Sequence, residues 1–154
     1  MDSNGLSFSS LNLPPGSQIF SFAGANIGDI PKILLASQSS LQDVDHIICN
    51  IGINNRDDVH VPDIIQHMQN LQQWCTVRAQ KIAWLGILQY ANLSREVTQN
   101  IKTINKVASD IFKDDFIPSV NSAEIAIKTG DKHKIHYTEK TARATVDIFD
   151  NSLN

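Results

Sequence analysis

Residues 46–55 read HIICNIGINN, and this stretch decides the fold. Its first part, His46–Ile51, is too continuously apolar for a strand with one face in water. A run of this kind is typical of a strand covered on both faces, and we predict that it is central in a parallel sheet. Gly52 and Asn54 follow at once, so the loop after this strand carries a glycine and an amide side chain.

The rest of the chain alternates similar runs with longer stretches of helical period. Further strands are predicted at Ile19–Phe22, Lys81–Leu88 and Phe116–Val120, and helices at Pro31–Leu35, Pro62–Arg78, Leu93–Phe112 and Thr138–Phe149. Such an alternation indicates parallel strands joined by crossover helices. We therefore predict one domain over residues 1–154, with a three-layer α/β/α architecture and a mostly parallel sheet.

Two of these helices have a clear apolar side. In the helix from Pro62 the apolar residues recur at spacings of three and four, at Ile64, Ile65, Met68, Leu71 and Trp74. In the last helix, Thr138 is the predicted N-cap and the apolar side carries Ala142, Val146 and Phe149. Both helices are expected to cover the sheet.

The composition excludes several classes of protein. The chain has 154 residues, 42% of them apolar, and a net charge of -3 with scattered basic residues, so we expect no direct binding to nucleic acid. Cys49 and Cys75 lie in apolar stretches and are predicted to be buried free thiols. No apolar run reaches the ~20 residues that span a bilayer, and the N-terminus has no signal-peptide pattern. These features indicate a soluble, intracellular protein.

Three loops carry candidate site residues. Gly24 follows the first predicted strand, Asn54 follows the second, and His136 precedes the last helix. Ligands of parallel α/β sheets bind beyond the carboxyl ends of the strands, where these loops are expected to meet. Each residue alone has a plainer explanation, since glycines turn chains and an Asn caps helices. His133 and His136 lack the further ligands that a metal site needs, so we predict no metal and no cofactor.

Taken together, these loops and the residues at the N-terminus resemble the four sequence blocks of the SGNH (GDSL) hydrolases. Asp2-Ser3-Asn4 is similar to the family's Gly-Asp-Ser block, Gly24 to its lone glycine, residues 52–55 to its Gly-x-Asn-Asp block and residues 133–136 to its Asp-x-x-His block. Residues 22–30 (FAGANIGDI) resemble the esterase-type domains of some retrotransposon and viral proteins. The resemblance covers nearly the whole chain and implies a flavodoxin-like SGNH fold.

The resemblance also implies a reaction. Ser3 would be the nucleophile and His136 the base, while the backbone N–H groups of Ser3 and Gly24 and the side chain of Asn54 would form an oxyanion hole. The substrate would be a small acyl or acetyl ester of a lipid, glycan or protein.

The sequence departs from the family pattern at three positions. His133 stands where the family has the aspartate that orients the base, so Asp131 or a backbone carbonyl would have to hold His136. Asn55 stands at a position that usually supports the loop. Met1 stands in place of the glycine before Asp2, so we expect the fold to lack the strand that precedes the nucleophile.

The matches to the family pattern, and the departures from it, leave two candidate functions. The first is a serine esterase. The alternative is a catalytically degenerate SGNH-like domain that self-associates or binds a partner within a larger transposon or viral protein. A nucleotide-binding flavodoxin-like domain is disfavoured, because no stretch has the spacing of a phosphate-binding loop.

Overall fold

The computed structural model describes residues 13, 15–89, 93–120 and 138–153, and these residues contain a parallel sheet of three strands. The strands pair in the order β1 (His46–Cys49), β2 (Lys81–Leu85) and β3 (Phe116–Ile117), with His46 opposite Lys81 and Trp84 opposite Phe116. All their carboxyl ends therefore meet at one edge of the sheet, as the sequence predicts.

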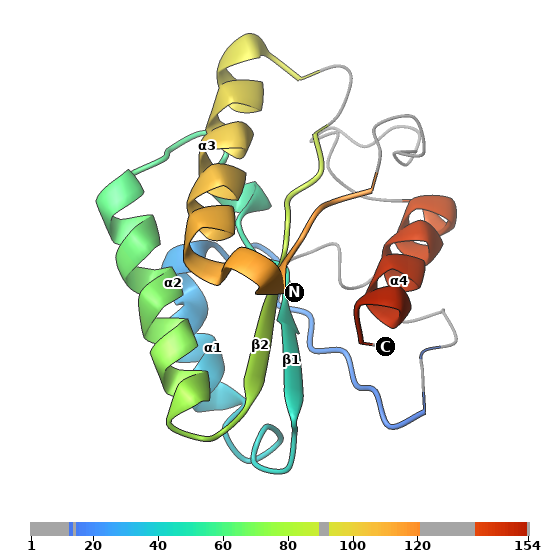
Figure 1. Ribbon diagram of the computed structural model, residues 1–154. Helices are drawn as coiled ribbons and strands as arrows, with labels where there is room; N and C mark the ends of the chain where they lie inside the picture. The colour runs from blue at the N-terminus through green and yellow to red at the C-terminus, as the bar shows by residue number, and fades with distance from the viewer. Residues whose placement is uncertain (1–12, 14, 90–92, 121–137, 154) are drawn as a thin grey trace.

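Helices cover both faces of this sheet. On one side lie α1 (Ile30–Ala36), α2 (Val61–Thr76) and α3 (Arg95–Phe112), and on the other lies α4 (Glu139–Leu153) (Figure 1). Short 3₁₀ turns lie between these elements, among them η2 (Ile27–Asp29), η3 (Ile53–Asn55) and η4 (Lys113–Asp115). The predicted three-layer α/β/α class is confirmed.

The helices begin where the sequence supplies start signals. Proline lies in the first turn of α1 and of α2, where its missing N–H has no helical partner to lose. At the start of α3, the Ser94 hydroxyl accepts a hydrogen bond from the Val97 N–H at 3.1 Å. At the start of α4, the Thr138 carbonyl accepts the Ala142 N–H at 3.0 Å, which supports Thr138 as the predicted N-cap.

The core lies between the sheet and α2, α3 and α4. The buried residues of α2 are Ile64, Met68, Leu71 and Cys75. The buried stripe of α2 thus includes Cys75. Trp74, which the sequence places in the stripe, is half-buried, and the guanidinium carbon of Arg78 lies 3.9 Å from the centre of its ring. Both cysteines are buried and neither is in a disulfide, as predicted. Burial raises the pKa of the Cys75 thiol from its ordinary value of 9.0 to about 11.

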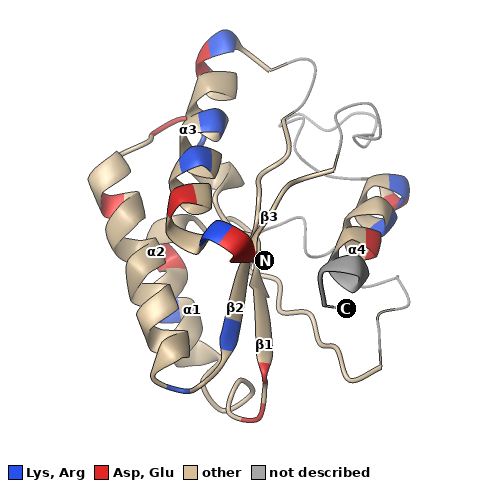
Figure 2. Cartoon of the chain, viewed as in Figure 1, with Lys and Arg blue, Asp and Glu red and all other residues tan. Residues whose placement is uncertain are grey.

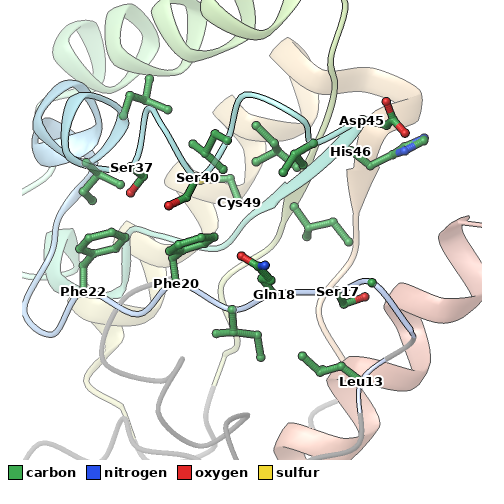
Figure 3. Close-up of a pocket in the computed structure, with 18 of the residues that line it drawn as sticks. Leu13, Ser17, Gln18, Phe20, Phe22, Ser37, Ser40, Asp45, His46 and Cys49 are labelled. Carbon is green, nitrogen blue, oxygen red and sulfur yellow. The ribbon is translucent and has the colours of Figure 1, made fainter.

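Two predictions about strands are wrong for the described residues. The run at His46–Ile51 is predicted to be central, but β1 forms one edge of the described sheet. The stretch Ile19–Phe22 is predicted to be a strand, but it is not assigned to any. It passes near β1, yet a groove lies between the two (Figure 3), and backbone groups separated by a groove cannot form a ladder.

Charged side chains of both signs lie along the helices (Figure 2), in agreement with the scattered charge of the sequence. No helix in the described part of the chain combines the length and the apolar character needed to cross a bilayer.

Candidate active site

Two loops meet at the carboxyl edge of the sheet. Asn54, in the loop after β1, donates a side-chain hydrogen bond to the carbonyl of Ala25 at 2.8 Å. Its neighbour Asn55 accepts a hydrogen bond from the backbone N–H of Ile27, also at 2.8 Å. These two bonds join segments 28 and 29 residues apart in sequence, and they bring Asn54 beside the residue that follows Gly24.

The loop at Gly24 depends on a backbone conformation that favours glycine. Gly24 has φ +79, and the N–H of Ala25 returns a hydrogen bond to the carbonyl of Phe22 at 3.1 Å. A Cβ added at Gly24 would have no heavy atom within 4 Å, and the residue is exposed. The turn therefore leaves space above Gly24 for a ligand to approach its backbone.

Gly52 has a different reason to be glycine. Its φ is +132, and an added Cβ would lie 2.8 Å from Cδ1 of Ile87 and 3.1 Å from Cδ1 of Ile27. Both isoleucines are buried, so the turn out of β1 presses directly on the core. This close packing fixes the position of η3, and with it the position of Asn54.

Asn54 keeps donor capacity beyond its contact with Ala25. A side-chain amide has two N–H donors, and the Ala25 carbonyl uses one of them. The side chain is half-buried, so a ligand at this edge has access to it. Asn55 uses its oxygen to support the neighbouring loop.

Two further asparagines hold this edge together, and the sequence analysis missed them. Asn50 donates to the carbonyl of Leu85 at 3.2 Å and so joins the ends of β1 and β2. Asn105 of α3 binds both the N–H and the carbonyl of Ile87, each at 2.8 Å. In the sequence, each of them is a polar residue inside an otherwise apolar run or helix face. Buried polar side chains are nearly always hydrogen-bonded, so this pattern could have indicated their structural role.

The other predicted site residues are Ser3, Asp131, His133 and His136, and all four lie outside the described residues. The pairing of a hydroxyl with an imidazole therefore remains a prediction. Among the residues described, no three His, Cys, Asp or Glu side chains gather in a way that could hold a metal ion.

Comparison with known proteins gives a likeness of fold. No family model matches the chain, and no curated protein matches it in sequence. A mutant of Axe2, an acetyl-xylooligosaccharide esterase from Geobacillus, superposes with a TM-score of 0.70 at 11% identity, over 88% of this chain and 71% of that one. The esterase EstA from Pseudoalteromonas sp. superposes with a TM-score of 0.63 at 14% identity, over 86% and 73%.

These identities are too low to transfer a reaction, but the superpositions establish the fold. The chain shares the α/β fold of these two esterases, which confirms the fold class predicted from the sequence. A fold of this kind hosts many functions, so the activity has to be argued from the site.

Proposed function

We propose that this domain is a serine esterase of the SGNH type that cleaves small acyl or acetyl esters through an acyl-enzyme. The observation that carries the proposal is the hydrogen bond from Asn54 to Ala25, which holds two oxyanion-hole candidates, Gly24 and Asn54, at one edge of the sheet. The fold likeness to two esterases supports it. On the sequence resemblance, we place it with the esterase-type domains of retrotransposon or viral proteins.

In the first half of the reaction, the Ser3 hydroxyl attacks the carbonyl carbon of the ester. His136 takes the hydroxyl proton as the new C–O bond forms, because a neutral hydroxyl is a poor nucleophile. His136 then gives this proton to the departing alkoxide, and the acyl group stays on Ser3. In the second half, water attacks the acyl-enzyme with His136 again acting as the base. The ester bond to Ser3 then breaks, His136 returns the proton to the Ser3 oxygen, and the acyl group leaves as a carboxylic acid.

The attacked carbonyl oxygen becomes negative in both halves. The N–H groups of Ser3 and Gly24, and the free side-chain N–H of Asn54, donate to it. Fixed donors of this kind act without reorganising during the reaction, and the loss of one typically costs about 3 kcal/mol of transition-state stabilisation. The bond from Asn54 to Ala25 supplies that fixed orientation.

The imidazole of His136 needs a group that holds its tautomer. His133 occupies the family's aspartate position and has no carboxylate, so we assign this role to Asp131, with a backbone carbonyl as the other source. An Asp131→Asn variant separates the two, because it lowers kcat only if the carboxylate orients the base.

The test is hydrolysis of p-nitrophenyl acetate by the wild type, Ser3→Ala and His136→Ala, with Ser39→Ala as a control at an exposed serine. Loss of the nucleophile or the base is expected to lower kcat by about 10³-fold or more. The control should keep the wild-type rate. Equal rates for the wild type and Ser3→Ala would overturn the proposal.

A further inference from the structure

The loop that carries Asn54 is anchored on two sides. On one side, Asn54 and Asn55 bond the loop that follows Gly24. On the other side, the side-chain amide of Asn100 in α3 donates to the backbone carbonyl of Arg56 at 2.7 Å. This second bond joins residues 44 apart in sequence, and Asn100 is half-buried. The loop is therefore tied to a helix as well as to its neighbouring loop.

Arg56 passes this anchor on to η3. Its backbone N–H donates to the carbonyl of Ile53 at 3.3 Å, and Nη1 of its guanidinium donates to the same carbonyl at 3.0 Å. The side chain of Arg56 is only 15% exposed, so little room is left for it to move. Because Asn54 lies between Ile53 and Arg56 in this turn, a shift of Arg56 would move Asn54 as well.

The helix α3 is a firm support for this contact. At about 100° per residue, Asn100 and Asn105 lie on opposite sides of its buried stripe. Asn100 bonds the loop after β1, and Asn105 bonds the segment after β2 through Ile87. The helix thus holds both loops in one frame. Its buried residues, which fix it to the core, are Ile101, Ile104, Ala108 and Phe112.

The position of η3 matters because an oxyanion-hole donor acts at short range. Such a donor is effective at about 2.7–3.1 Å from the developing negative oxygen, and it contributes most when it does not reorganise during the reaction. A misplacement of about 1 Å can lower a rate by up to about 10²-fold. The bond from Asn54 to Ala25 sets the direction of the amide, and the position of the whole turn depends on what anchors η3.

We propose that Asn100 is a positioning residue for the esterase reaction: by holding the carbonyl of Arg56, it keeps the second side-chain N–H of Asn54 where the oxyanion forms. The inference rests on the esterase function proposed above. In this role Asn100 does not touch the substrate and acts through Asn54. Its loss should therefore lower kcat and leave KM nearly unchanged.

A double-mutant cycle with p-nitrophenyl acetate tests this coupling, with the Ser3→Ala rate subtracted as background. Asn100→Ala is expected to lower kcat by about tenfold in the wild type, and by less than about twofold in an Asn54→Ala background. The second effect is small because the donor that Asn100 positions has already been removed. Asn100→Asp keeps the shape of the side chain without its N–H donors, so it should lower kcat at least as much as Asn100→Ala.

The matched control is Gln72→Ala. Gln72 of α2 also donates from a side-chain amide to a backbone carbonyl, that of Ile111 in α3, at 3.4 Å. Ile111 lies near the end of α3, whereas Asn100 lies near its start. The control therefore removes the same kind of tertiary bond to α3 at a distance from the candidate site, and it should keep the wild-type kcat.

Amide hydrogen exchange tests the anchor without ester hydrolysis. The N–H of Ile27 donates to Oδ1 of Asn55, so its protection reports how firmly η3 is held. The N–H of Lys81, which donates to Asp45, serves as the reference for the sheet. Asn100→Ala is expected to speed exchange at Ile27 by about fivefold or more relative to Lys81, and Gln72→Ala is expected to leave this ratio unchanged.

Two results would contradict the role given to Asn100. One is a fall in kcat of the same size with and without Asn54, which would make Asn100 a purely structural residue. The other is an unchanged exchange ratio at Ile27. A wild type without Ser3-dependent hydrolysis would instead overturn the esterase proposal, and with it the catalytic role of Asn100. Faster exchange at Ile27 in that case would leave Asn100 as a structural anchor of η3, so the two proposals can fail separately.

Discussion

At the scale of single residues, Asn54 and Asn55 divide two tasks between adjacent amides. Asn55 accepts from the Ile27 N–H and supports the neighbouring loop, and Asn54 binds the Ala25 carbonyl with one N–H. In the function that we propose, the second N–H of Asn54 binds the substrate. Asn54 is therefore the described residue at which stability and catalysis can be separated most clearly.

Replacing Asn54 with alanine should reduce catalysis far more than folding. We expect kcat/KM for p-nitrophenyl acetate to fall by about 10²–10³-fold, because one oxyanion donor is lost. The free energy of unfolding should fall by about 1 kcal/mol, the usual contribution of one hydrogen bond. Steady-state kinetics and urea titration measure the two effects.

The matched control is Asn70→Ala, which removes an exposed amide of α2 that is bonded only to Gln66 in the described structure. It should leave both quantities nearly unchanged. An Asn54→Ala enzyme with full activity would remove this residue from the oxyanion hole.

Cys75 makes the stability depend on pH. Its pKa is about 11 in the fold because burial disfavours the thiolate, against 9.0 for the ordinary thiol. The unfolded chain therefore ionises first, and the stabilisation is complete below pH 9 and lost as the pH rises from 9 to 11. Urea unfolding at pH 8 and pH 10 should show a smaller decline for Cys75→Ala than for the wild type, and equal declines would contradict this account.

At the scale of elements, the turn between β1 and η3 fixes the position of the candidate site relative to the sheet. Gly52→Ala should cost about 2–4 kcal/mol of unfolding free energy, since it combines an unfavourable positive φ with a Cβ placed 2.8 Å from Ile87. Gly16→Ala has the same kind of φ, +83, but no heavy atom within 4 Å of the added Cβ, and should cost about 1 kcal/mol. Thermal or urea unfolding compares them, and equal costs would show that the contact with Ile87 does not matter.

The contact between α3 and the segment after β2 depends on Asn105. Its alanine variant leaves the buried N–H and carbonyl of Ile87 without their side-chain partner, so we expect a loss of about 2–3 kcal/mol. Lys102→Ala, on the exposed side of the same helix, should change the stability by less than about 0.5 kcal/mol. A loss for Asn105→Ala no larger than that of the control would contradict the role given to Asn105.

The sequence predicted the helices well because their apolar periods are long and their starts are marked. Pro62 and Thr138 lie where α2 and α4 begin. The predicted strands were less accurate. The sequence predicts one strand from Lys81 to Leu88, but β2 ends at Leu85, and the last bond to β3 runs from the Gly86 N–H to the carbonyl of Ile117. Hydrophobicity alone does not distinguish a buried strand from the buried loop after it.

The edge position of β1 and the contacts of the site could not be read from the sequence. Whether a strand is central depends on what pairs with its second edge, and the apolar run at Ile19–Phe22 gave no sign that a groove separates it from β1. Gly24 and Asn54 are predicted from their places just after two apolar runs, and the family resemblance supports both. The bonds of Asn50 and Asn105 depend on distant backbone groups that only the folded chain brings together.

At the scale of the whole molecule, the three parallel strands of the described sheet direct their following loops to one edge, and helices on both faces bury the core beneath them. This division leaves the edge free to carry polar groups while apolar packing supplies the stability. A groove also runs along β1 at the side of the same sheet.

The proposed reaction depends most on Ser3 as its activated nucleophile. The most direct test is to treat the protein with a fluorophosphonate probe and to locate the adduct by peptide mass spectrometry. We predict one adduct, on the peptide that contains Ser3, formed by the wild type and absent from Ser3→Ala and His136→Ala. An unlabelled Ser3, or equal labelling of the wild type and the His136→Ala variant, would contradict it.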